Sequence, residues 1–379
     1  MTNKAAMTNK AAQLVQLLRS TKRDKRLGTV ILFVTSRCNA FCQTCFYHAE
    51  LNQPGDMSFA QIEKVSRTMP PITDLWLSGG EPTLRRDLSD IIDMFVANNG
   101  ADRIIIPTNG LIKTRVYDVV DRALENNPKI DLYLNIALDG YGETHDRIRG
   151  VPGNWEKALA CIEWLYPLKS KYTDRFRLNV NTVVCAENYT EIEMLSEFMW
   201  ENYRLDGQYF NIIRGETLVG EQIKQVPPEV LPAMYAHVSK LTKRYGERMF
   251  AADDRSKRFV KNAVYAGTII THYRTQHANF QHPTPWPFTC TAGETATVID
   301  YNGDVRACEL RAKFASLADF DYDFSALWSA NERQQELNAI DGGNACWCTH
   351  VCFIHDSMRH SRRSMLYEIP KNYLTRESW

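Results

Sequence analysis

Strand-like and helix-like segments alternate from residue 28 to residue 215, and this alternation restricts the fold more than any other feature. Six short apolar segments predict strands, and each is followed by residues whose apolar positions recur at helical spacing. The predicted strands are residues 30–34, 75–77, 104–106, 130–138, 177–184 and 209–213. Repeated strand–helix units predict a parallel sheet, and six of them are too few for a complete eight-unit barrel.

Two of the predicted strands carry polar residues on one face. One face of the fourth strand carries Tyr133, Asn135, Ala137 and Asp139. One face of the fifth strand carries Arg177, Asn179 and Asn181. Their opposite, apolar faces can pack on helices, so the polar faces are expected to line an interior cavity. A sheet with one solvent-exposed face is the alternative, but the neighbouring strands have the apolar character of buried strands. The pattern therefore predicts an α/β fold built on a partial (β/α)6 TIM-like barrel.

Charge and hydropathy argue against nucleic-acid binding, membrane insertion and secretion. The chain has 45 basic and 45 acidic residues, and a formal net charge of zero argues against a dedicated nucleic-acid binder. No apolar run in the sequence reaches the roughly 18 residues that a membrane helix needs. The first residues are polar and basic, without the apolar segment of a signal peptide. We therefore expect a cytoplasmic protein that binds neither membrane nor nucleic acid.

The chain has ten cysteines, and eight of them fall into two groups, one towards each end. Disulfides are rare in a reducing compartment, where clustered cysteines more often bind metal. Cys161 and Cys185 stand apart from both groups, at positions that predict ordinary buried residues of a helix and a strand. Both groups are therefore candidate metal sites.

The first group is Cys38, Cys42 and Cys45, on a loop that follows the first predicted strand. It lies at the carboxyl end of the strands, where parallel barrels build their active sites. A 4Fe–4S cubane usually takes four cysteines, so three thiolates leave one iron open to a ligand. Two alternatives compete: a structural zinc site completed by His48, and cysteines that bind no metal.

Together with the aromatic Phe46 that follows it, this C-x3-C-x2-C motif resembles the signature of the radical S-adenosylmethionine (SAM) superfamily. The resemblance implies that Cys38, Cys42 and Cys45 are catalytic and hold a 4Fe–4S cluster whose open iron binds SAM. One electron from the cluster then cleaves SAM to methionine and a 5′-deoxyadenosyl radical, which abstracts hydrogen from a substrate. The cofactor carries the chemistry, and the protein supplies mainly orientation and seclusion. The resemblance also implies an electron donor such as flavodoxin or ferredoxin.

Further motifs at the ends of the predicted strands extend the resemblance. Ser78–Pro82 resembles the family's GGEP segment, which contacts the SAM amino group, and its glycines allow backbone to approach a ligand closely. Residues 138–150 resemble a second family stretch, although Ala137 replaces the serine usually found there. Arg214, which ends the sixth strand, can pair with a carboxylate or lie on the surface. By this resemblance the SAM-binding residues are Phe46, Gly79, Gly80, Glu81, Thr108, Asn109, Asp139, Arg149, Asn179 and Asn181.

The second group consists of Cys290, Cys308, Cys346, Cys348 and Cys352. Two short strand-like segments flank a turn at Gly303, and a helix is expected over residues 324–337. This order resembles the twitch module, a shorter relative of the SPASM extension of radical SAM enzymes. The resemblance implies a small cysteine-rich α+β module with one auxiliary 4Fe–4S cluster and one cysteine to spare.

The ligands of this second site stay open at the level of the sequence. Either Cys346 or Cys348 can be the spare cysteine, and His350 and His355 are further candidate ligands. Four thiolates would close the cluster and suit electron transfer, whereas an open iron would suit substrate binding. The alternative to a cluster is a zinc knuckle.

These features divide the chain into five parts. They are an N-terminal extension (1–27), a radical SAM partial barrel (28–215), a helical linker (216–288), a twitch/SPASM-like auxiliary cluster module (289–360) and a C-terminal tail (361–379).

The resemblance predicts an enzyme that abstracts hydrogen from a small-molecule substrate, such as a sugar or a cyclitol, in an oxidation or a rearrangement. The first alternative is a maturase that cross-links, epimerises or oxidises a ribosomally made peptide. Only 37 residues precede Cys38, so we expect any peptide-recognition partner to be a separate protein. The second alternative is a zinc-binding protein without catalysis.

Overall fold

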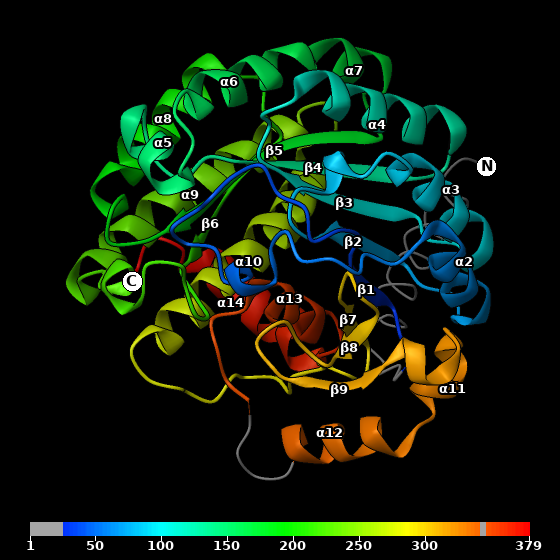
Figure 1. The fold of residues 1–379 in the computed structure, drawn as a ribbon. Coiled ribbons are helices and arrows are strands. Elements are labelled where there is room, and N and C mark those ends of the chain that lie inside the picture. Colours follow the sequence, from blue (N-terminus) through cyan, green and yellow to red (C-terminus); the bar gives the residue numbers. More distant parts are fainter. Residues whose placement is uncertain (1–25, 342–345) are drawn as a thin grey trace, which may run out of the picture.

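A single sheet of nine strands, in the order β6-β5-β4-β3-β2-β1-β7-β8-β9, runs through the residues that the structure describes. The computed structural model describes residues 26–341 and 346–379 (Figure 1). The predicted N-terminal extension therefore lies outside the described residues, except for Arg26 and Leu27. Within these ranges, every helix is too short or too polar to cross a membrane.

Six of the strands are parallel and form the curved part of the sheet. They are β1 (Thr29–Phe33), β2 (Asp74–Ser78), β3 (Arg103–Thr108), β4 (Asp131–Ala137), β5 (Phe176–Val184) and β6 (Gly207–Ile212). Each strand pairs in parallel with the next, with Val30 opposite Leu75 and Asn135 opposite Asn179. The predicted α/β fold with a partial (β/α)6 barrel is therefore confirmed.

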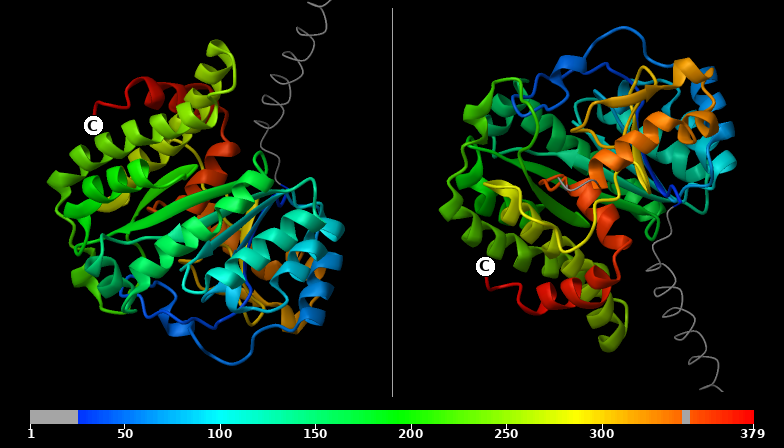
Figure 2. Two further views of the ribbon diagram at one scale, coloured as in Figure 1. Left: turned by 90° about the horizontal axis from the view of Figure 1, so that it is seen from above. Right: turned by 90° about the horizontal axis from the view of Figure 1, so that it is seen from below.

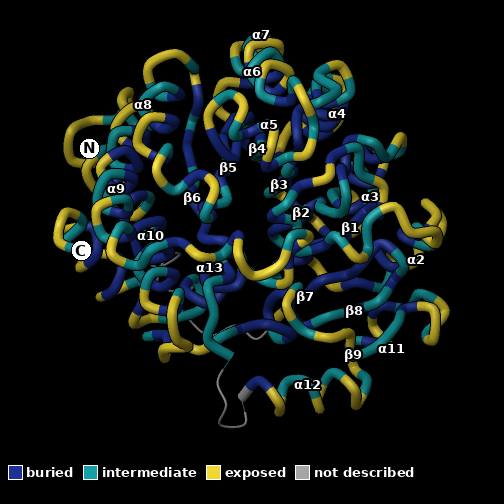
Figure 3. Tube along the Cα trace, turned by 60° about the vertical axis from the view of Figure 1, so that its left-hand side comes forward, coloured by how far each residue is buried: buried dark blue, intermediate teal, exposed yellow. Residues whose placement is uncertain are grey.

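Helices cover the outer face of these strands and form the arc seen in Figure 1. They are α2 (Phe59–Thr68), α3 (Leu88–Asn99), α4 (Lys113–Asn126), α5 (Glu143–Arg149), α6 (Asn154–Trp164), α7 (Tyr166–Lys171) and α8 (Ile192–Asn202). Their apolar faces pack on the outward-facing residues of the strands and form one core with them. Ile91 of α3 and Leu132 of β4 are both part of this core. Buried and partly buried residues alternate along β4, because one face packs on helices and the other borders the barrel interior (Figure 3).

Local hydrogen bonds set the ends of two of these helices. Ser58 precedes α2, where its side chain accepts from Gln61 N–H while the Gln61 side chain accepts from Ser58 N–H. This reciprocal pair satisfies two N–H groups that the first turn leaves unpaired. The helix α3 ends at Gly100, whose left-handed conformation glycine adopts without strain.

In the described part of the chain the sheet does not close at β6, and helices cover this edge instead. The covering helices are α9 (Leu231–Met249) and α10 (Arg255–Phe280). Phe210 N–H donates to Tyr273 Oη at 3.4 Å, and Ile212 N–H donates to Gln276 Oε1 at 3.0 Å. An uncovered strand edge exposes unpaired backbone groups that can pair with another chain. Here side chains of α10 accept hydrogen bonds from the β6 backbone in place of a neighbouring strand.

The C-terminal part of the chain continues the same sheet. Its strands are β7 (Ala296–Ile299), β8 (Asp304–Arg306) and β9 (Lys313–Ser316). The strand β7 lies parallel to β1 and antiparallel to β8, so the hairpin predicted around Gly303 is attached directly to the first barrel strand (Figure 2). The region predicted to be the auxiliary module therefore shares its sheet with the barrel.

Four helices complete the C-terminal part. They are α11 (Phe324–Trp328), α12 (Asn331–Asp341), α13 (Val351–Arg359) and α14 (Ile369–Leu374). The single helix predicted over residues 324–337 is wrong, because the chain turns after Trp328 and lets Arg333 stack on that ring at 3.9 Å. Both α13 and α14 contact α10, so this part closes the side of the barrel that α10 covers.

Candidate active site

A cavity of about 600 Å³ occupies the interior of the barrel. The strands form one wall, while α10, α13 and Glu309 form the opposite wall. The cavity extends from the first cysteine group, at the carboxyl ends of the strands, to Asp74 and Arg103 at their amino ends. As predicted, the polar strand faces line it, through Tyr133, Asn135, Ala137, Asp139, Asn179 and Asn181. Arg177 was expected on the same face, but it lies outside the lining and donates to the carbonyl oxygen of Thr173.

The loop after β1 brings Cys38, Cys42 and Cys45 to one end of this cavity. The loop has an irregular backbone, which the neighbouring elements hold in place. Phe41 N–H donates to the carbonyl oxygen of Arg149 at 3.1 Å, so the end of α5 supports the loop between the first two cysteines. All three thiols therefore border one cavity from one short segment.

The three thiols fit a shared metal cluster better than three separate cysteines. Burial raises the pKa of Cys38 to about 11 and that of Cys45 to about 12, and it also raises the pKa of Cys42. Each thiolate would further raise the pKa of its neighbours, because their charges repel at short range. A set of buried thiolates needs bound cations, and the irons of a cluster supply that charge.

The two glycines that follow β2 pack against the cysteine loop. Gly80 N–H donates to Thr35 O at 2.8 Å, and Glu81 N–H donates to Arg37 O at 2.7 Å. A Cβ atom on Gly79 would overlap the Thr35 carbonyl, and one on Gly80 would overlap the Arg37 carbonyl. The neighbouring backbone thus requires glycine here, and the same segment borders the cavity.

Glu81 is buried beside the thiols, and both of its carboxylate oxygens accept hydrogen bonds. Its Oε1 accepts from the hydroxyls of Thr83 and Thr108 at 2.6 and 2.8 Å, and its Oε2 accepts from Asn109 N–H at 2.8 Å. Burial raises the pKa of Glu81, and these hydrogen bonds oppose the rise. Asn109 Nδ2 also donates to Asn39 Oδ1 at 2.8 Å, which ties the group to the cysteine loop. Residues from three separate motifs therefore present one carboxylate that can attract an ammonium group.

Asp139 and Arg149 form a buried ion pair next to the same thiols. Arg149 Nη1 lies 3.0 Å from Asp139 Oδ2, and Asp139 Oδ1 accepts from Val183 N–H at 2.8 Å. Burial alone would lower the pKa of Arg149, but the charges of Cys42 and Asp139 raise it, so the guanidinium stays positive. The buried Nε atom of Arg149 has no hydrogen-bond partner among the described residues. A buried donor without a partner fits a bound carboxylate.

Asparagines form the side wall of the cavity. Asn179 Nδ2 donates to Asn135 Oδ1 at 3.1 Å, and Asn211 Nδ2 donates to Asn181 Oδ1 at 2.7 Å. Sequence reasoning missed Asn211, although it lies two residues after Tyr209 on the same face of β6 and both border the cavity. The period-two pattern that identified the other two strands could have found it.

The opposite wall of the cavity comes from helices, whose sequences have no pattern that predicts residues at a cavity. The helix α10 contributes Tyr265 and His272, and α13 contributes Cys352 and His355. His355 Nδ1 lies 3.2 Å from His272 Nε2, and burial lowers the pKa of both imidazoles, to about 3 for His355. These helices therefore add two neutral imidazoles and a thiol to the cavity.

Arg214, which the sequence left between two placements, faces the cavity. Its guanidinium lies 5.0 Å from the centre of the Phe46 ring, and its Nη2 lies 3.2 Å from Glu309 Oε2. His350 Nε2 lies 2.5 Å from the same carboxylate oxygen. Burial would raise the pKa of Glu309, but His350 and Arg214 lower it to about 2, so the carboxylate is ionised. These residues connect the first cysteine loop to the segment that carries Cys308.

Four cysteines of the second group influence one another, namely Cys290, Cys308, Cys346 and Cys348. Burial raises the pKa of Cys290 to about 12, and the nearby thiolates of Cys346 and Cys348 raise it further. The charges of Glu309 and Arg214 act on the thiol of Cys352, and Glu309 also acts on Cys308 and Arg214 on Cys348. Cys352 also borders the barrel cavity, which sets it apart from the other four.

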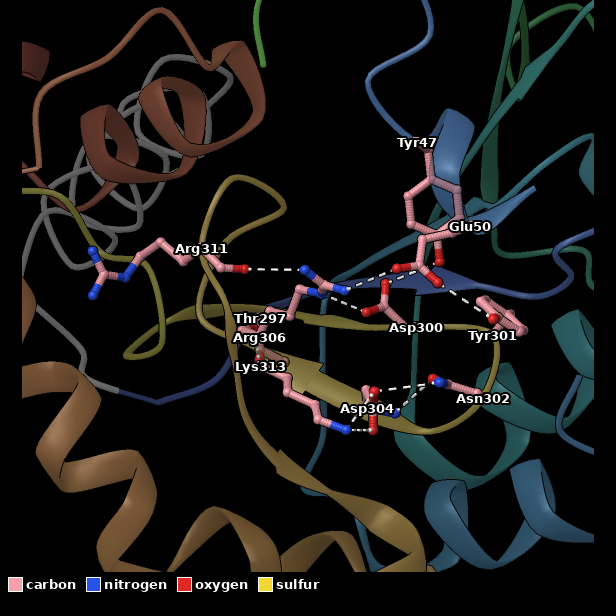
Figure 4. A network of polar contacts seen from close by, with 10 residues as sticks. All are labelled: Tyr47, Glu50, Thr297, Asp300, Tyr301, Asn302, Asp304, Arg306, Arg311 and Lys313. Carbon is pink, nitrogen blue, oxygen red and sulfur yellow. Dashed lines mark hydrogen bonds and ion pairs between the residues drawn. The ribbon is translucent and has the colours of Figure 1, made fainter. Parts of the chain in front are cut away.

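A polar network joins the second site to the segment just after the first (Figure 4). Tyr47 Oη donates to Asp300 Oδ1 at 3.1 Å, and Tyr301 Oη donates to Glu50 Oε2 at 3.3 Å. Arg306 Nε donates to the other Asp300 oxygen at 2.5 Å. The hairpin that leads into the second cysteine group is thus bonded to the chain that leaves the first.

Residues 32–199 match the sequence profile described as the Radical SAM superfamily. The barrel region of the chain belongs to the radical SAM superfamily. The matched range contains the three-cysteine loop, the glycine segment and the ion pair of Asp139 with Arg149. Membership in this superfamily implies SAM, a catalytic 4Fe–4S cluster and a reductant.

Two curated relatives show how far the likeness extends along this radical SAM enzyme. The pre-heme d1 synthase of Dinoroseobacter shibae is 34% identical over 138 residues, which are 35% of this chain and 32% of that protein. The mycofactocin maturase MftC of Mycolicibacterium smegmatis is 25% identical over 328 residues, which are 83% of this chain and 73% of that protein. The chain spans about a third to a half of the length of the first curated relatives that it matches.

A solved structure shows the same fold. The structure of native anSMEcpe with bound AdoMet and Cp18Cys peptide matches this radical SAM enzyme with a TM-score of 0.55 at 15% sequence identity. The match covers 93% of this chain and 96% of that chain, so it includes both the barrel and the C-terminal part.

Proposed function

We propose that this radical SAM enzyme binds SAM at a 4Fe–4S cluster on Cys38, Cys42 and Cys45 and abstracts hydrogen from a small-molecule substrate in the same cavity. The observation that supports this proposal most directly is that three thiols, a buried carboxylate and a buried ion pair meet at one end of one cavity. When bound, the cluster supplies the electron that divides SAM into methionine and a 5′-deoxyadenosyl radical. The protein's own residues bind, orient and seclude the reactants.

Glu81 and Arg149 are the residues best placed to hold the amino-acid end of SAM. The Glu81 carboxylate attracts the ammonium group, and the unpaired Nε atom of Arg149 can donate to the carboxylate. Thr108 and Asn109 orient Glu81 through their hydrogen bonds. The other residues that we assign to the SAM pocket are Phe46, Gly79, Gly80, Asp139, Asn179 and Asn181.

We assign the auxiliary 4Fe–4S cluster to Cys290, Cys308, Cys352 and one of Cys346 and Cys348. Four thiolates would complete the coordination of a cubane, which suits electron transfer better than substrate binding. In this proposal the radical SAM barrel is residues 28–215, the helical linker is 216–288 and the auxiliary module is 289–360. A protein such as flavodoxin or ferredoxin would deliver electrons to the first cluster.

The size and lining of the cavity favour a small, polar substrate. A volume of about 600 Å³ lies in the range of small-molecule pockets, and SAM must share it. Asparagines, tyrosines and two neutral histidines line the part away from the thiols, which suits the hydroxyl groups of a sugar or cyclitol. The second candidate substrate is a ribosomally made peptide, favoured by the match to MftC, which extends into the C-terminal part.

Anaerobic purification and cluster reconstitution test the first part of the proposal. We expect about eight irons per chain and, with a flavodoxin system or dithionite, formation of 5′-deoxyadenosine from SAM. The triple variant Cys38→Ala/Cys42→Ala/Cys45→Ala should keep about four irons and make no nucleoside. The control is Cys161→Ala, which changes a buried cysteine of α6 outside both groups. A colourless protein that contains zinc and does not cleave SAM would contradict the proposal.

Deuterium transfer separates the two substrate classes. The reduced enzyme is incubated with SAM and either carbon-deuterated polyols or a deuterated precursor peptide. Deuterium in 5′-deoxyadenosine from a polyol supports a small-molecule substrate. Transfer from the peptide alone would support the maturase instead.

A further inference from the structure

We propose that the outer side of the first cysteine loop, around Phe41 and Arg37, is the docking surface for the electron donor, and that the donor is an acidic carrier protein of the flavodoxin type. This inference rests on the proposed function, because it assumes a 4Fe–4S cluster on the three cysteines of that loop. It concerns a surface separate from the cavity, since neither Phe41 nor Arg37 is among the residues that line the cavity.

The cysteine loop has one side towards the cavity and one side towards solvent. Cys38, Cys42 and Cys45 border the cavity, whereas the side chain of Phe41, next to Cys42, is 63% exposed. Cys38 is only partly buried, so little protein separates the thiols from solvent at this loop. Electron transfer between proteins slows steeply with distance. A donor therefore reaches the cluster best from the outer side of this loop, because helices cover the outer face of the barrel strands.

Phe41 is the most exposed aromatic side chain in residues 26–341 and 346–379. Within these ranges its ring contacts no other ring and no cation, whereas Phe259, at 58% exposure, packs edge-on against the Tyr373 ring at 5.9 Å. Single exposed apolar residues are common on protein surfaces, so exposure alone does not identify a docking site. The position of Phe41 does, because its N–H donates to Arg149 O at 3.1 Å and holds the residue beside Cys42. An unpaired ring on a fixed backbone next to the metal ligands fits the central anchor of an interface.

The charges at this end of the barrel favour an acidic partner. Arg37 is exposed, and its guanidinium makes no hydrogen bond or ion pair with any described residue. The same holds for Arg86, on the loop that follows the glycine segment. Acidic side chains of neighbouring segments are engaged within the chain: Asp56 accepts hydrogen bonds from the loop itself, and Glu187 pairs with Arg147 at 3.0 Å. Two arginines are therefore available to attract a surface rich in carboxylates, which speeds encounter and orients the partner.

The docked donor would deliver one electron through the loop. The reduced flavin of the donor is oxidised by one electron, and the cluster is reduced by one electron. No bond forms or breaks at the surface, and no proton has to move there. The surface around Phe41 and Arg37 therefore affects the delivery of the electron and not the binding of SAM.

Calorimetric titration of the reconstituted, full-length enzyme with an acidic flavodoxin tests the proposal without turnover. Phe41→Ala, which keeps the backbone hydrogen bond to Arg149, should weaken binding about tenfold or more. Arg37→Gln should weaken it about threefold to tenfold and make it less sensitive to salt. The matched control is Phe259→Ala, which removes a ring of similar exposure from α10 and should bind flavodoxin normally. All variants should keep about eight irons.

SAM cleavage then compares two reductants. With reduced flavodoxin below saturation, Phe41→Ala should form 5′-deoxyadenosine about tenfold more slowly than the unchanged protein. With dithionite, a small reductant that needs no protein interface, the two proteins should be equally fast.

Three binding results would overturn the proposal. They are no binding of flavodoxin by the unchanged protein, equal binding by the unchanged protein and Phe41→Ala, and equal weakening in Phe259→Ala. A loss of nucleoside formation with dithionite in Phe41→Ala would also overturn it, because Phe41 would then serve the cluster itself. If the unchanged protein made no nucleoside with dithionite, the proposed function would fail, whereas the binding measurements would still decide the docking surface.

Discussion

The two cysteine groups are built in different ways, although both lie next to one cavity. The first group takes its cysteines from one loop of eight residues, Cys38 to Cys45. The glycine segment after β2 and the end of α5 hold the backbone of that loop. The second group takes its cysteines from three segments: one before β7, one after β8, and one that leads into the first turn of α13.

This difference has a physical consequence for how each site assembles. Ligands that are close in sequence lose little chain entropy when they bind one metal cluster, whereas ligands from distant segments lose more. In the proposed function, the second site draws on the folding energy of the hairpin, and cluster binding there is coupled to folding. We expect the first site to depend on its backbone supports and the second to depend on the tertiary contacts around it.

The largest expected effect separates the two sites by chemistry. Cys42→Ala and Cys308→Ala should each lose about four irons. Cys42→Ala should lower 5′-deoxyadenosine formation to background, whereas Cys308→Ala should still cleave SAM without substrate, because the first cluster remains. Iron analysis and chromatography of the nucleoside measure both quantities. If Cys308→Ala were equally inactive, the two sites would not be independent in SAM cleavage.

The backbone support of the first site predicts the second-largest effect. In Gly80→Ala, the added methyl group would overlap the Arg37 carbonyl, and we expect a loss of about 3 kcal/mol in the free energy of unfolding. The matched control is Gly28→Ala, where the nearest atom would be Thr295 O at 4.0 Å. That control should change stability by less than about 0.5 kcal/mol. Denaturant unfolding measures both variants, and equal stabilities would contradict the close packing of the two loops.

A buried histidine near the first site predicts a dependence of stability on pH. His145 Nδ1 accepts from Asp139 N–H at 2.9 Å, and burial lowers the pKa of His145 from 6.5 to about 4. As the pH falls below 6.5, the unfolded chain binds a proton that the folded chain does not, so stability decreases until the pH is below the folded pKa. The expected contribution is a loss of about 2 kcal/mol between pH 7 and pH 5.

Denaturant unfolding at the two pH values tests this expectation. His145→Gln should lose less stability than the unchanged protein on acidification, because the titrating group is gone. His282→Gln, which changes an exposed histidine, should behave like the unchanged protein. Equal losses in all three proteins would show that the neutral state of His145 does not limit stability.

The smallest expected effect concerns an ion pair on the surface between the two parts. Lys64 of α2 and Asp321 of the C-terminal part lie 2.8 Å apart, and both side chains are exposed. Water and salt screen such pairs, so Asp321→Asn should lower the free energy of unfolding by at most about 0.5 kcal/mol. A larger loss by denaturant unfolding would mean that surface charges, rather than the shared sheet and the Asp300 network, join the parts.

Local patterns predicted which residues of the first group and of two strands lie at the same cavity. The spacing of Cys38, Cys42 and Cys45 and the polar alternation of β4 and β5 each involve residues that are close in sequence. The same alternation continues in β6, where Asn211 was overlooked. The hydrogen bonds from Thr108 and Asn109 to Glu81 were not predictable, because they join the ends of two strands through side-chain geometry.

The second site and the far wall of the cavity could not be predicted in the same way. Cys352 and His355 lie on the short helix α13, and the contact of α13 with α10 determines which of its faces points towards the barrel. Nothing in their spacing distinguishes a residue at a cavity from one at a helix interface.

The sequence by itself determined the parallel barrel, the three-cysteine loop and the family, because hydrophobic period and cysteine spacing act over a few residues. Only the tertiary structure decided that β7 joins β1, that α10 and α13 complete the cavity, and that Glu309, His350 and Cys352 meet. Those contacts arise when segments distant in the chain pack together, and packing depends on the shapes of all the neighbours at once.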